Sequence, residues 1–332
     1  MLELDIAVII VTYKCADLTI ESLRSIEAER SDAGLRIRAI VVDNASGDLP
    51  AIAAAVSANG WGSWVSLVLS PKNGGFAYGN NLGIARAYSE RTPSYIYLLN
   101  PDAQVRAGAI RCLVQFLEQH PRVGIAGSSI ETLDGCDWPF AFRFPTLVSE
   151  LLDGLEFGLL NRLLQRWMVA QHMTRVAQSV DWVCGASMLI RPAAFAAVGG
   201  LDENYFLYFE ETDFCSRARK ADFSTWYVPE SRVMHIIGQS TKVTDLTAGP
   251  KRLPGYWFES RRRYFAVTYG MGYAILADLV ALGAYSLGWL KRVATMTRHR
   301  VVPYFVWDLL RHSVLWPRNR DFPLLRGFRP PG

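Results

Sequence analysis

The sequence predicts an α/β fold built on a mainly parallel sheet, followed by a helical C-terminal region. Two observations lead to this prediction. Apolar runs suited to strands alternate with stretches suited to helices over the first hundred residues, as in sheets with right-handed crossovers. After about Thr241 the composition becomes aromatic and basic. At 332 residues, the chain exceeds the roughly 250–300 at which a single core stops growing, so a large domain with an appendage is expected.

The alternation can be followed element by element. Apolar, β-branched or aromatic runs predict strands, and stretches with one apolar face predict helices. Strands are expected at 6–11, 37–42, 64–69 and 95–99, and helices at 17–29, 49–58 and 76–89. Asp17 is expected to cap the first helix.

Polar residues follow several of these strands. Thr12, Asp43, Asn73 and Asp102 all fall at the C-terminal edge of the expected sheet, where such sheets bind ligands. A carboxylate such as that of Asp102 can hold a divalent ion, which would neutralise the phosphates of a diphosphate ester. Taken alone, Asn-Pro-Asp at 100–102 is more often a simple turn.

The stretch 72–83, KNGGFAYGNNLG, is rich in glycine and precedes a predicted helix. Glycine lets the backbone approach a ligand, and a helix N-terminus attracts anions. The spacing is neither a Walker loop nor GxGxxG. A glycine-rich turn with close helix packing is an equally good interpretation of composition alone.

Four motifs of this region and four later ones resemble glycosyltransferase family 2, particularly its bacterial rhamnosyltransferase-like members. They are VTY at 11–13, VVDNAS at 41–46, NGGFAYGNN at 73–81, NPD at 100–102, DWVCGA at 181–186, GGLDE at 199–203, YFEETD at 208–213 and VMH at 233–235. The resemblance covers roughly residues 5 to 240.

The resemblance implies the GT-A fold, a nucleotide-diphosphate sugar donor and a divalent metal, Mn²⁺ or Mg²⁺. It assigns Thr12, Tyr13 and Asp43 to the nucleoside, Asn73, Gly74, Gly75 and Asn80 to the diphosphate side, Asp102 and His235 to the metal, and Trp182, Gly185 and Ala186 to the sugar and acceptor. Asn100 departs from the family pattern, because many relatives have an aspartate there. A histidine in an apolar strand is more often a core residue, but as a ligand it would favour Mn²⁺ slightly.

Glu210, Glu211 and Asp213 are candidates for the catalytic base, which takes the proton of the attacking hydroxyl. The resemblance favours the second acidic position, Glu211, although relatives usually have aspartate there, with Asp213 next. In a helix, Glu210 and Asp213 share a face, whereas Glu211 points about 100° away. The ordinary alternative is helix-dipole stabilisation with an i,i+4 pair between Asp213 and Arg217.

Charge and cysteine content exclude some classes of function. The net charge of +4 is too small to indicate a nucleic-acid partner. The five cysteines are odd in number and too scattered for a zinc site, so they are expected to be reduced and mostly buried. The first residues do not read as a secretory signal, so a cytoplasmic catalytic part is expected.

The C-terminal region contains an almost wholly apolar stretch at 272–290, with Asp278 as its one charged residue. Its length approaches that of a membrane span, but a central aspartate would cost on the order of 3 kcal/mol. Tyr256, Trp257, Phe258, Trp289, Trp307 and Trp316, mixed with arginines 261–263, favour helices lying at an anionic membrane surface. A true span and a soluble helical bundle remain alternatives.

These observations divide the chain at 1–240, a GT-A domain with a mobile helical insert at 139–178 near the acceptor entrance, and 241–332, a membrane-associating region. The resemblance implies an inverting transferase that moves L-rhamnose from dTDP-L-rhamnose onto a lipid-linked diphosphate sugar, in cell-envelope polysaccharide synthesis at the inner face of the cytoplasmic membrane. The alternatives are a UDP-hexose or UDP-galactofuranose transferase, and a non-catalytic nucleotide-sugar-binding assembly protein.

Overall fold

The apolar runs of the first hundred residues form parallel strands, as predicted. The computed structural model describes residues 3–31, 34–132, 137–138, 141–171, 174–236, 251–296 and 302–330. In spatial order, β3 (Val65–Leu69), β2 (Leu35–Asp43), β1 (Leu4–Thr12) and β4 (Tyr95–Leu99) lie side by side and run parallel. Thr12 pairs with Asp43, so the ends of β1 and β2 are level.

The second half of the sheet is mixed. Next to β4 come β11 (Ser187–Ile190), β6 (Val123–Glu131), β12 (Ser224–His235) and β5 (Ala103–Val105). β11 is antiparallel to both β4 and β6, whereas β12 is parallel to β6 and antiparallel to β5. Short strands complete the sheets, namely β7 (Asp137–Trp138), β8 (Ala141–Phe142), β9 (Gln178–Val180) and β10 (Trp182–Val183). The pairing of His235 with Ala103 brings β12 beside Asp102.

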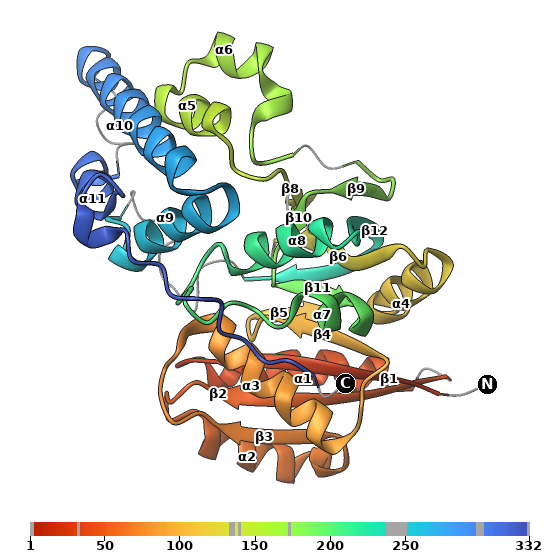
Figure 1. The fold of residues 1–332 in the computed structure, drawn as a ribbon. Helices are drawn as coiled ribbons and strands as arrows, with labels where there is room; N and C mark the ends of the chain where they lie inside the picture. The colour runs from red at the N-terminus through yellow and green to blue at the C-terminus, as the bar shows by residue number, and fades with distance from the viewer. Residues whose placement is uncertain are drawn as a thin grey trace.

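Helices connect the strands and cover both faces of the sheet (Figure 1). They are α1 (Ala16–Glu29), α2 (Leu49–Ala58), α3 (Gly75–Glu90), α4 (Ala109–Gln119), α7 (Pro192–Val198) and α8 (Glu210–Lys220), with a 3₁₀ turn η1 at Trp61–Ser63. The expectation that Asp17 caps α1 is wrong, because Cys15 is the N-cap and Asp17 lies in the first turn. The glycine-rich stretch is also largely helical, since α3 begins at Gly75.

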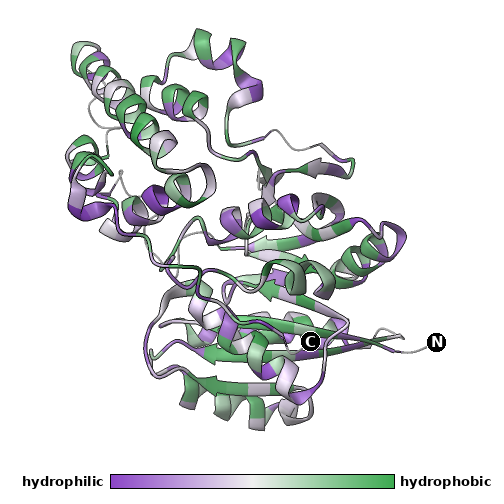
Figure 2. Ribbon diagram, viewed as in Figure 1, coloured by the Kyte–Doolittle hydropathy of each residue, from purple (hydrophilic) through white to green (hydrophobic). Residues whose placement is uncertain are grey.

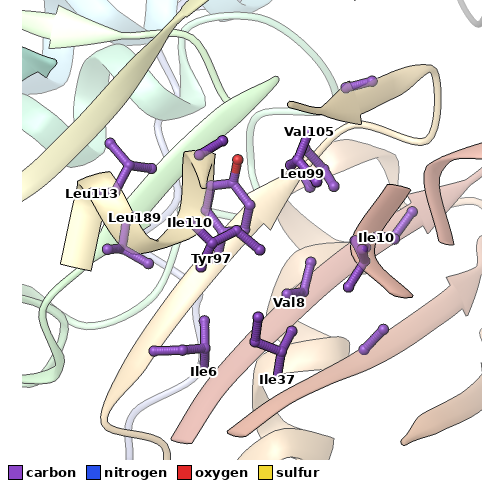
Figure 3. Close-up of a cluster of buried hydrophobic side chains, with 14 of the residues drawn as sticks. Ile6, Val8, Ile10, Ile37, Tyr97, Leu99, Val105, Ile110, Leu113 and Leu189 are labelled. Atoms are coloured by element: carbon purple, nitrogen blue, oxygen red, sulfur yellow. The ribbon is translucent and has the colours of Figure 1, made fainter. Parts of the chain in front are cut away.

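The core explains why β1 is apolar at every position from Ile6 to Val11. Ile6, Val8 and Ile10 pack into one cluster with residues of α4, while Ala7, Ile9 and Val11 pack into another on the opposite face. Figure 3 shows the first cluster, in which Ile110 and Leu113 of α4 lie near Tyr97 and Leu189. A strand covered on both faces needs this continuous apolar pattern.

A helical region lies beside the sheet domain, at the upper left of Figure 1. It contains α5 (Leu147–Leu155), α6 (Gly158–Leu163), α9 (Gly255–Tyr269), α10 (Met271–Ala294) and α11 (Phe305–His312), with 3₁₀ turns η2 (Gln165–Trp167) and η4 (Pro317–Asn319). The predicted insert therefore contributes α5 and α6 to the same body as the C-terminal helices. The predicted boundary at 240/241 lies outside the described residues.

α10 is, among the described residues, the one helix long and apolar enough to cross a membrane, and a third of its most apolar window is buried. Asp278 is 2% exposed and does not face lipid or water. It accepts hydrogen bonds from Arg261 at 2.6 Å and from the Val314 backbone at 2.7 Å. The central charge of α10 is thus neutralised inside the protein.

Three residues expected at the membrane surface are interior, which corrects that expectation. Arg261 pairs with Glu150 of α5 at 2.8 Å as well as with Asp278. Arg263 pairs with Asp202 at 2.5 Å, and Phe258 is 2% exposed. The two arginines were misassigned because composition does not distinguish an arginine in a buried ion pair from an arginine on the surface.

The C-terminal tail returns to the sheet domain, where the dark-blue trace in Figure 1 passes α3 and α7. The backbone N–H groups of Gly200 and Glu203 donate to the carbonyls of Phe328 and Arg326, both at 2.7 Å. The ring of Phe328 lies 5.6 Å from that of Tyr88. The tail therefore holds the segment that leads to α8.

The described cysteines are unpaired, but the expectation that most are buried is wrong. Cys215 is buried, whereas Cys15, Cys112 and Cys184 are partly exposed. Cys136 lies outside the described residues.

Candidate active site

Asp43 orders the loop that follows β2. Its Oδ1 accepts hydrogen bonds from the backbone N–H of Ser46 at 2.8 Å and from the Ser46 hydroxyl at 2.7 Å, and its Oδ2 accepts one from the Leu49 N–H at 3.1 Å. Burial alone would raise the pKa of Asp43, but these bonds outweigh it and hold the pKa below its ordinary value. Asp43 is therefore a fixed carboxylate, and its contact with a nucleoside stays a prediction.

Thr12 and Tyr13 end β1 beside this loop. The Thr12 hydroxyl donates to Asp48 at 2.7 Å, and the same carboxylate oxygen accepts from the Cys15 N–H at 2.9 Å. Tyr13 is partly exposed and lies under the Lys14 ammonium, 5.3 Å from the ring centroid. Asp48 was missed by sequence reasoning, because an aspartate before Leu49-Pro50 reads as an ordinary helix cap.

The side chains of two asparagines hold the glycine-rich loop by hydrogen bonds. The side-chain amide of Asn44 donates to Asn73 Oδ1 at 3.0 Å and to the Gly75 carbonyl at 3.1 Å, while Asn73 Oδ1 also accepts from the Gly75 N–H. Gly75 has φ +85°, and a Cβ there would lie 1.9 Å from the Phe206 carbonyl. Glycine is required at 75 for both reasons.

The remaining residues of this stretch have structural contacts. A Cβ on Gly74 would lie 2.3 Å from the Tyr78 ring. Asn80 is 1% exposed and donates to the Phe76 carbonyl at 2.9 Å. Asn81 donates to the Leu201 carbonyl at 2.8 Å, so α3 is joined to the segment before α8. Asn80 thus faces its own helix rather than open space.

Asp102 and His235 meet although 133 residues separate them. His235 Nε2 lies 3.1 Å from Asp102 Oδ1 and 3.2 Å from Asn100 Nδ2. Asp102 is 3% exposed, and its Oδ2 has no hydrogen-bond partner among the described residues. The 3.1 Å between Nε2 and Oδ1 is a hydrogen-bond distance. It also matches the roughly 3 Å between cis ligands of an octahedral ion bound at roughly 2.0–2.1 Å, so the pair fits one divalent cation.

This pair fits a metal that is completed by other ligands. Within the described part of the chain, no cluster of three His, Cys, Asp or Glu residues could hold a metal alone. A buried carboxylate oxygen without a partner is costly unless a cation or donor satisfies it. Substrate phosphates and water are the usual remaining ligands at such sites.

The three acidic residues at the start of α8 have different surroundings. Glu211 is partly exposed and its Oε1 accepts from the Gly185 N–H at 3.0 Å. Asp213 is 2% exposed and pairs with Arg217 at 2.7 Å, and Arg217 also donates to the Val198 carbonyl. Glu210 is 1% exposed, and its Oε2 has no partner among the described residues. The predicted i,i+4 pair is confirmed.

Burial shifts the titration of all three carboxyls. It raises the pKa of Glu210 well above its ordinary value, and the charge of Glu211 adds to this. Burial also raises the pKa of Glu211, although the backbone N–H groups of Glu211 and Gly185 oppose it. For Asp213 burial again outweighs the opposing charge of Arg217. A raised pKa suits a carboxyl that must accept a proton near neutral pH.

The turn at 184–186 is where the motifs converge. Gly185 donates to Glu211, and a Cβ on Gly185 would lie 2.8 Å from both Glu211 Oε1 and the Phe76 ring. The carbonyl of Ala186 accepts from the Asn100 N–H at 3.3 Å. This one turn therefore contacts the glycine-rich loop, the Asp102 loop and the acidic helix.

Trp182 lies two residues before the start of this turn. Its ring stacks on Phe142 with centroids 4.2 Å apart, and its Nε1 donates to the Arg143 carbonyl at 3.0 Å. These contacts join the turn to the segment that leads to α5. A contact of Trp182 with a sugar or acceptor stays a prediction.

Part of the chain is similar to known glycosyltransferases. Residues 7–154 match the model of the family described as glycosyl transferase family 2. The chain is 34% identical over 152 residues to an N-acetylglucosaminyl-diphospho-decaprenol L-rhamnosyltransferase of Mycobacterium tuberculosis. This match covers 44% of this chain and 48% of that protein. The chain is 25% identical over 177 residues to the rhamnosyltransferase WbbL of Escherichia coli, a match that covers 48% of this chain and 60% of WbbL. The chain thus spans about half the length of the curated relatives it matches.

A solved structure shares the fold. GalNAc-T7, crystallised with UDP, GalNAc and Mn²⁺, superposes with a TM-score of 0.57 over 93% of this chain and 57% of the other, at 14% identity. At this identity the likeness concerns the fold alone. It confirms the predicted GT-A architecture.

Proposed function

Residues 7–154 match the model of glycosyl transferase family 2, and from this premise we propose that the chain is an inverting, metal-dependent glycosyltransferase. The observation that carries the proposal is the turn at 184–186. The Gly185 N–H donates to Glu211, and the Ala186 carbonyl accepts from the N–H of Asn100, in the loop that bears Asp102. A proton acceptor and a cation ligand held near one turn suit the transfer of a sugar from a diphosphate.

The best supported substrates are a nucleotide-diphosphate sugar and a lipid-linked sugar acceptor. The Mycobacterium and Escherichia relatives are named rhamnosyltransferases, and the former acts on a diphospho-decaprenol lipid. We therefore propose L-rhamnose from dTDP-L-rhamnose as the transferred sugar, with the lipid-linked acceptor at the inner face of the cytoplasmic membrane. A UDP-hexose or UDP-galactofuranose donor is the alternative within the same chemistry.

Asp102 and His235 would hold the divalent ion, which when bound supplies positive charge for the leaving diphosphate. The protein's own groups do the remaining work. The N-terminus of α3 lies at Gly75, but the backbone N–H groups of Gly75 and Phe76 already donate to Asn73 Oδ1 and to the Phe206 carbonyl. The helix dipole, and not these two groups, would therefore favour the diphosphate. Glu211 receives the proton of the acceptor hydroxyl as that oxygen attacks the sugar from the face opposite the diphosphate.

Titration calorimetry tests the metal ligands. Asp102→Ala and His235→Ala should each abolish the Mn²⁺-dependent part of nucleotide binding, while wild-type protein binds the nucleotide more tightly with Mn²⁺ than without. Unchanged Mn²⁺ dependence in Asp102→Ala contradicts the metal site. The same result in His235→Ala alone returns that histidine to a structural role.

Mass spectrometry of products tests the substrates. Purified protein is supplied with a panel of nucleotide sugars and a lipid-linked acceptor, and the added mass identifies the sugar. Neither transfer nor donor hydrolysis with any donor, from protein that binds nucleotide, would favour a non-catalytic binding protein.

A further inference from the structure

The helical region contains a cavity of about 1000 Å³ that lies apart from the candidate active site. α5, α9, α10 and α11 contribute to its wall, which is rich in aromatic side chains, among them Trp257, Tyr285, Trp289, Phe305 and Trp307. This volume is at the upper end of the roughly 300–1,000 Å³ of small-molecule sites. An apolar space of this size is suited to a hydrocarbon.

The wall of the cavity continues into exposed apolar surface. Trp289, Leu290 and Trp307 line the cavity and are also 48%, 54% and 60% exposed. From Leu290, a row of exposed leucines runs back along α10 through Leu287, Leu279 and Leu276, and Figure 2 shows this helix as largely hydrophobic. A chain leaving a lipid layer could enter the cavity without crossing water.

The C-terminal region is basic in composition, but much of its charge is used in ion pairs. Residues 251–330 contain 14 Lys and Arg against four Asp and Glu, while the whole chain has 35 against 31. Arg261 and Arg263 are buried in ion pairs, and Arg252 pairs with Asp308. The cavity is lined by the carboxyls of Asp153 and Glu156 as well as by Arg292, so its apolar wall, and not a local positive charge, favours a hydrocarbon. Arg292 lines the cavity itself, where it pairs with Glu156.

α9 connects the cavity to the candidate active site. The ring of Trp257 lies 6.1 Å from that of Phe209, the residue that precedes Glu210 and Glu211. The Ser260 hydroxyl donates to the Leu207 carbonyl at 3.0 Å. One ring contact thus separates the cavity wall from the helix that carries the proposed base.

We propose that this cavity binds the hydrocarbon chain of the lipid that carries the acceptor sugar. The inference rests on the function proposed above, because that function makes the acceptor a lipid. The chain would lie among Trp257, Phe305 and Tyr285, and the diphosphate and sugar would extend past Phe209 toward Glu211. The enzyme would thus select its acceptor partly by the isoprenoid chain.

Calorimetry with geranylgeranyl diphosphate, a short isoprenoid diphosphate used below its micelle concentration, tests this. Ser286 and Val306 line the cavity and are half-buried, so Ser286→Trp and Val306→Trp would each fill it. Both should weaken binding at least tenfold. Leu69→Trp, which places the same side chain at an exposed position of the sheet domain outside the cavity, should bind as wild type does.

Three results would overturn the proposal. The first is wild-type affinity in both filled variants with unchanged unfolding temperatures. The second is displacement of the probe by inorganic diphosphate, which would show that only the head binds. The third is equally tight competition by dioleoylphosphatidylglycerol, which would make the occupant an ordinary membrane lipid. Nucleotide binding with Mn²⁺ is measured in every variant, because its absence in wild type would contradict the proposed function and not the cavity.

Discussion

At the scale of residues, Glu211 and Asp213 show how neighbours distinguish two carboxylates. They lie two positions apart at the start of α8, yet Glu211 contacts the Gly185 turn and Asp213 contacts Arg217. The guanidinium of Arg217 also donates to the carbonyls of Val198 and Gly200. The pair of Asp213 and Arg217 therefore joins α8 to the end of α7. The contacts of Asp213 are structural, and Glu211 stays the proposed base.

Glu211→Gln should keep the fold and the affinity for donor but lower turnover by about two to four powers of ten, the usual contribution of a general base. Glutamine preserves the hydrogen bond from Gly185, so the loss would come from proton transfer. Turnover and nucleotide affinity are measured together. Asp213→Asn is the comparison, expected to lower the unfolding temperature by weakening the Arg217 pair. Near-normal turnover in Glu211→Gln with loss in folded Asp213→Asn would exchange the two roles.

Glu210 should make stability depend on pH. Its pKa is raised well above 4.5 by burial and by the charge of Glu211. The folded protein therefore holds this proton more tightly than the unfolded chain, so the free energy of unfolding decreases as pH rises from about 4.5 through the folded-state pKa. Glu210→Gln should be more stable than wild type at pH 8 and show a flatter profile. Denaturant unfolding from pH 5 to 8 measures this, and parallel profiles would contradict it.

At the scale of elements, α10 buries its small residues and exposes leucines. Apart from Asp278, its buried residues are Ala274, Ala277, Ala281, Ala284 and Gly288. Leu276, Leu279, Leu287 and Leu290 are exposed. Gly288 allows close contact, since a Cβ there would lie 2.1 Å from the Gly154 carbonyl of α5. Because α5 and α9 cover one side of α10, its exposed apolar surface lies on the other side, and its contact with a membrane stays a prediction.

Leu279→Ser together with Leu287→Ser should reduce binding to anionic liposomes at least tenfold. Both leucines are more than half exposed, and burying one apolar side chain is worth roughly 1.5–3 kcal/mol. Flotation with phosphatidylglycerol vesicles measures the effect. Leu69→Ser, 63% exposed at the end of β3 in the sheet domain, is the matched control. Equal flotation of all three proteins would contradict a membrane-facing α10.

At the scale of the whole molecule, the helical region and the sheet domain are joined by buried charges. Arg263 of α9 pairs with Asp202 at 2.5 Å and donates to the Pro323 carbonyl at 2.9 Å. Asp202 also accepts from the Arg326 N–H, so helix, tail and the segment before α8 meet at one carboxylate. That segment includes Phe206, whose carbonyl holds the loop at Gly75 and Phe76.

Arg263→Ala should therefore cost about 3–5 kcal/mol of stability, the usual effect of leaving a buried charge unpaired. Nucleotide affinity should fall as well, because the segment that holds the glycine-rich loop loses its anchor. Urea unfolding and nucleotide titration measure the two effects. Arg24→Ala breaks the exposed pair with Glu21 and should cost less than about 1 kcal/mol. Similar unfolding curves for the two variants would show that the anchor is dispensable.

The same contacts affect how the membrane region can be studied. Removing everything after 241 would delete Arg261, Arg263 and Phe328, and with them the partners of Glu150, Asp202 and Tyr88. Such a truncation would leave the buried carboxylate of Asp202 without its arginine partner in the sheet domain, and Glu150 of α5 without its own. Point substitutions on exposed faces are therefore the cleaner test of membrane binding.

The sequence alone determined the local structure of the sheet domain. The predicted strands at 6–11, 37–42, 64–69 and 95–99 and the helix at 49–58 correspond to β1, β2, β3, β4 and α2. These elements are predictable because the period of apolar residues and the turn-forming Gly, Pro, Asn and Asp act over a few residues. The placement of Thr12 and Asp43 at one edge followed from the same rule.

Only the tertiary structure decided which of these residues meet. Asp102 contacts His235, which lies 133 positions later in the sequence. Gly185 contacts Glu211 over 26 positions, and Thr12 contacts Asp48 over 36 positions. Composition could not distinguish the buried Arg261 and Arg263 from surface arginines, because burial depends on where an opposite charge lies in the fold. Periodicity reports which face of an element is covered, whereas the partner that covers it is set by long-range packing.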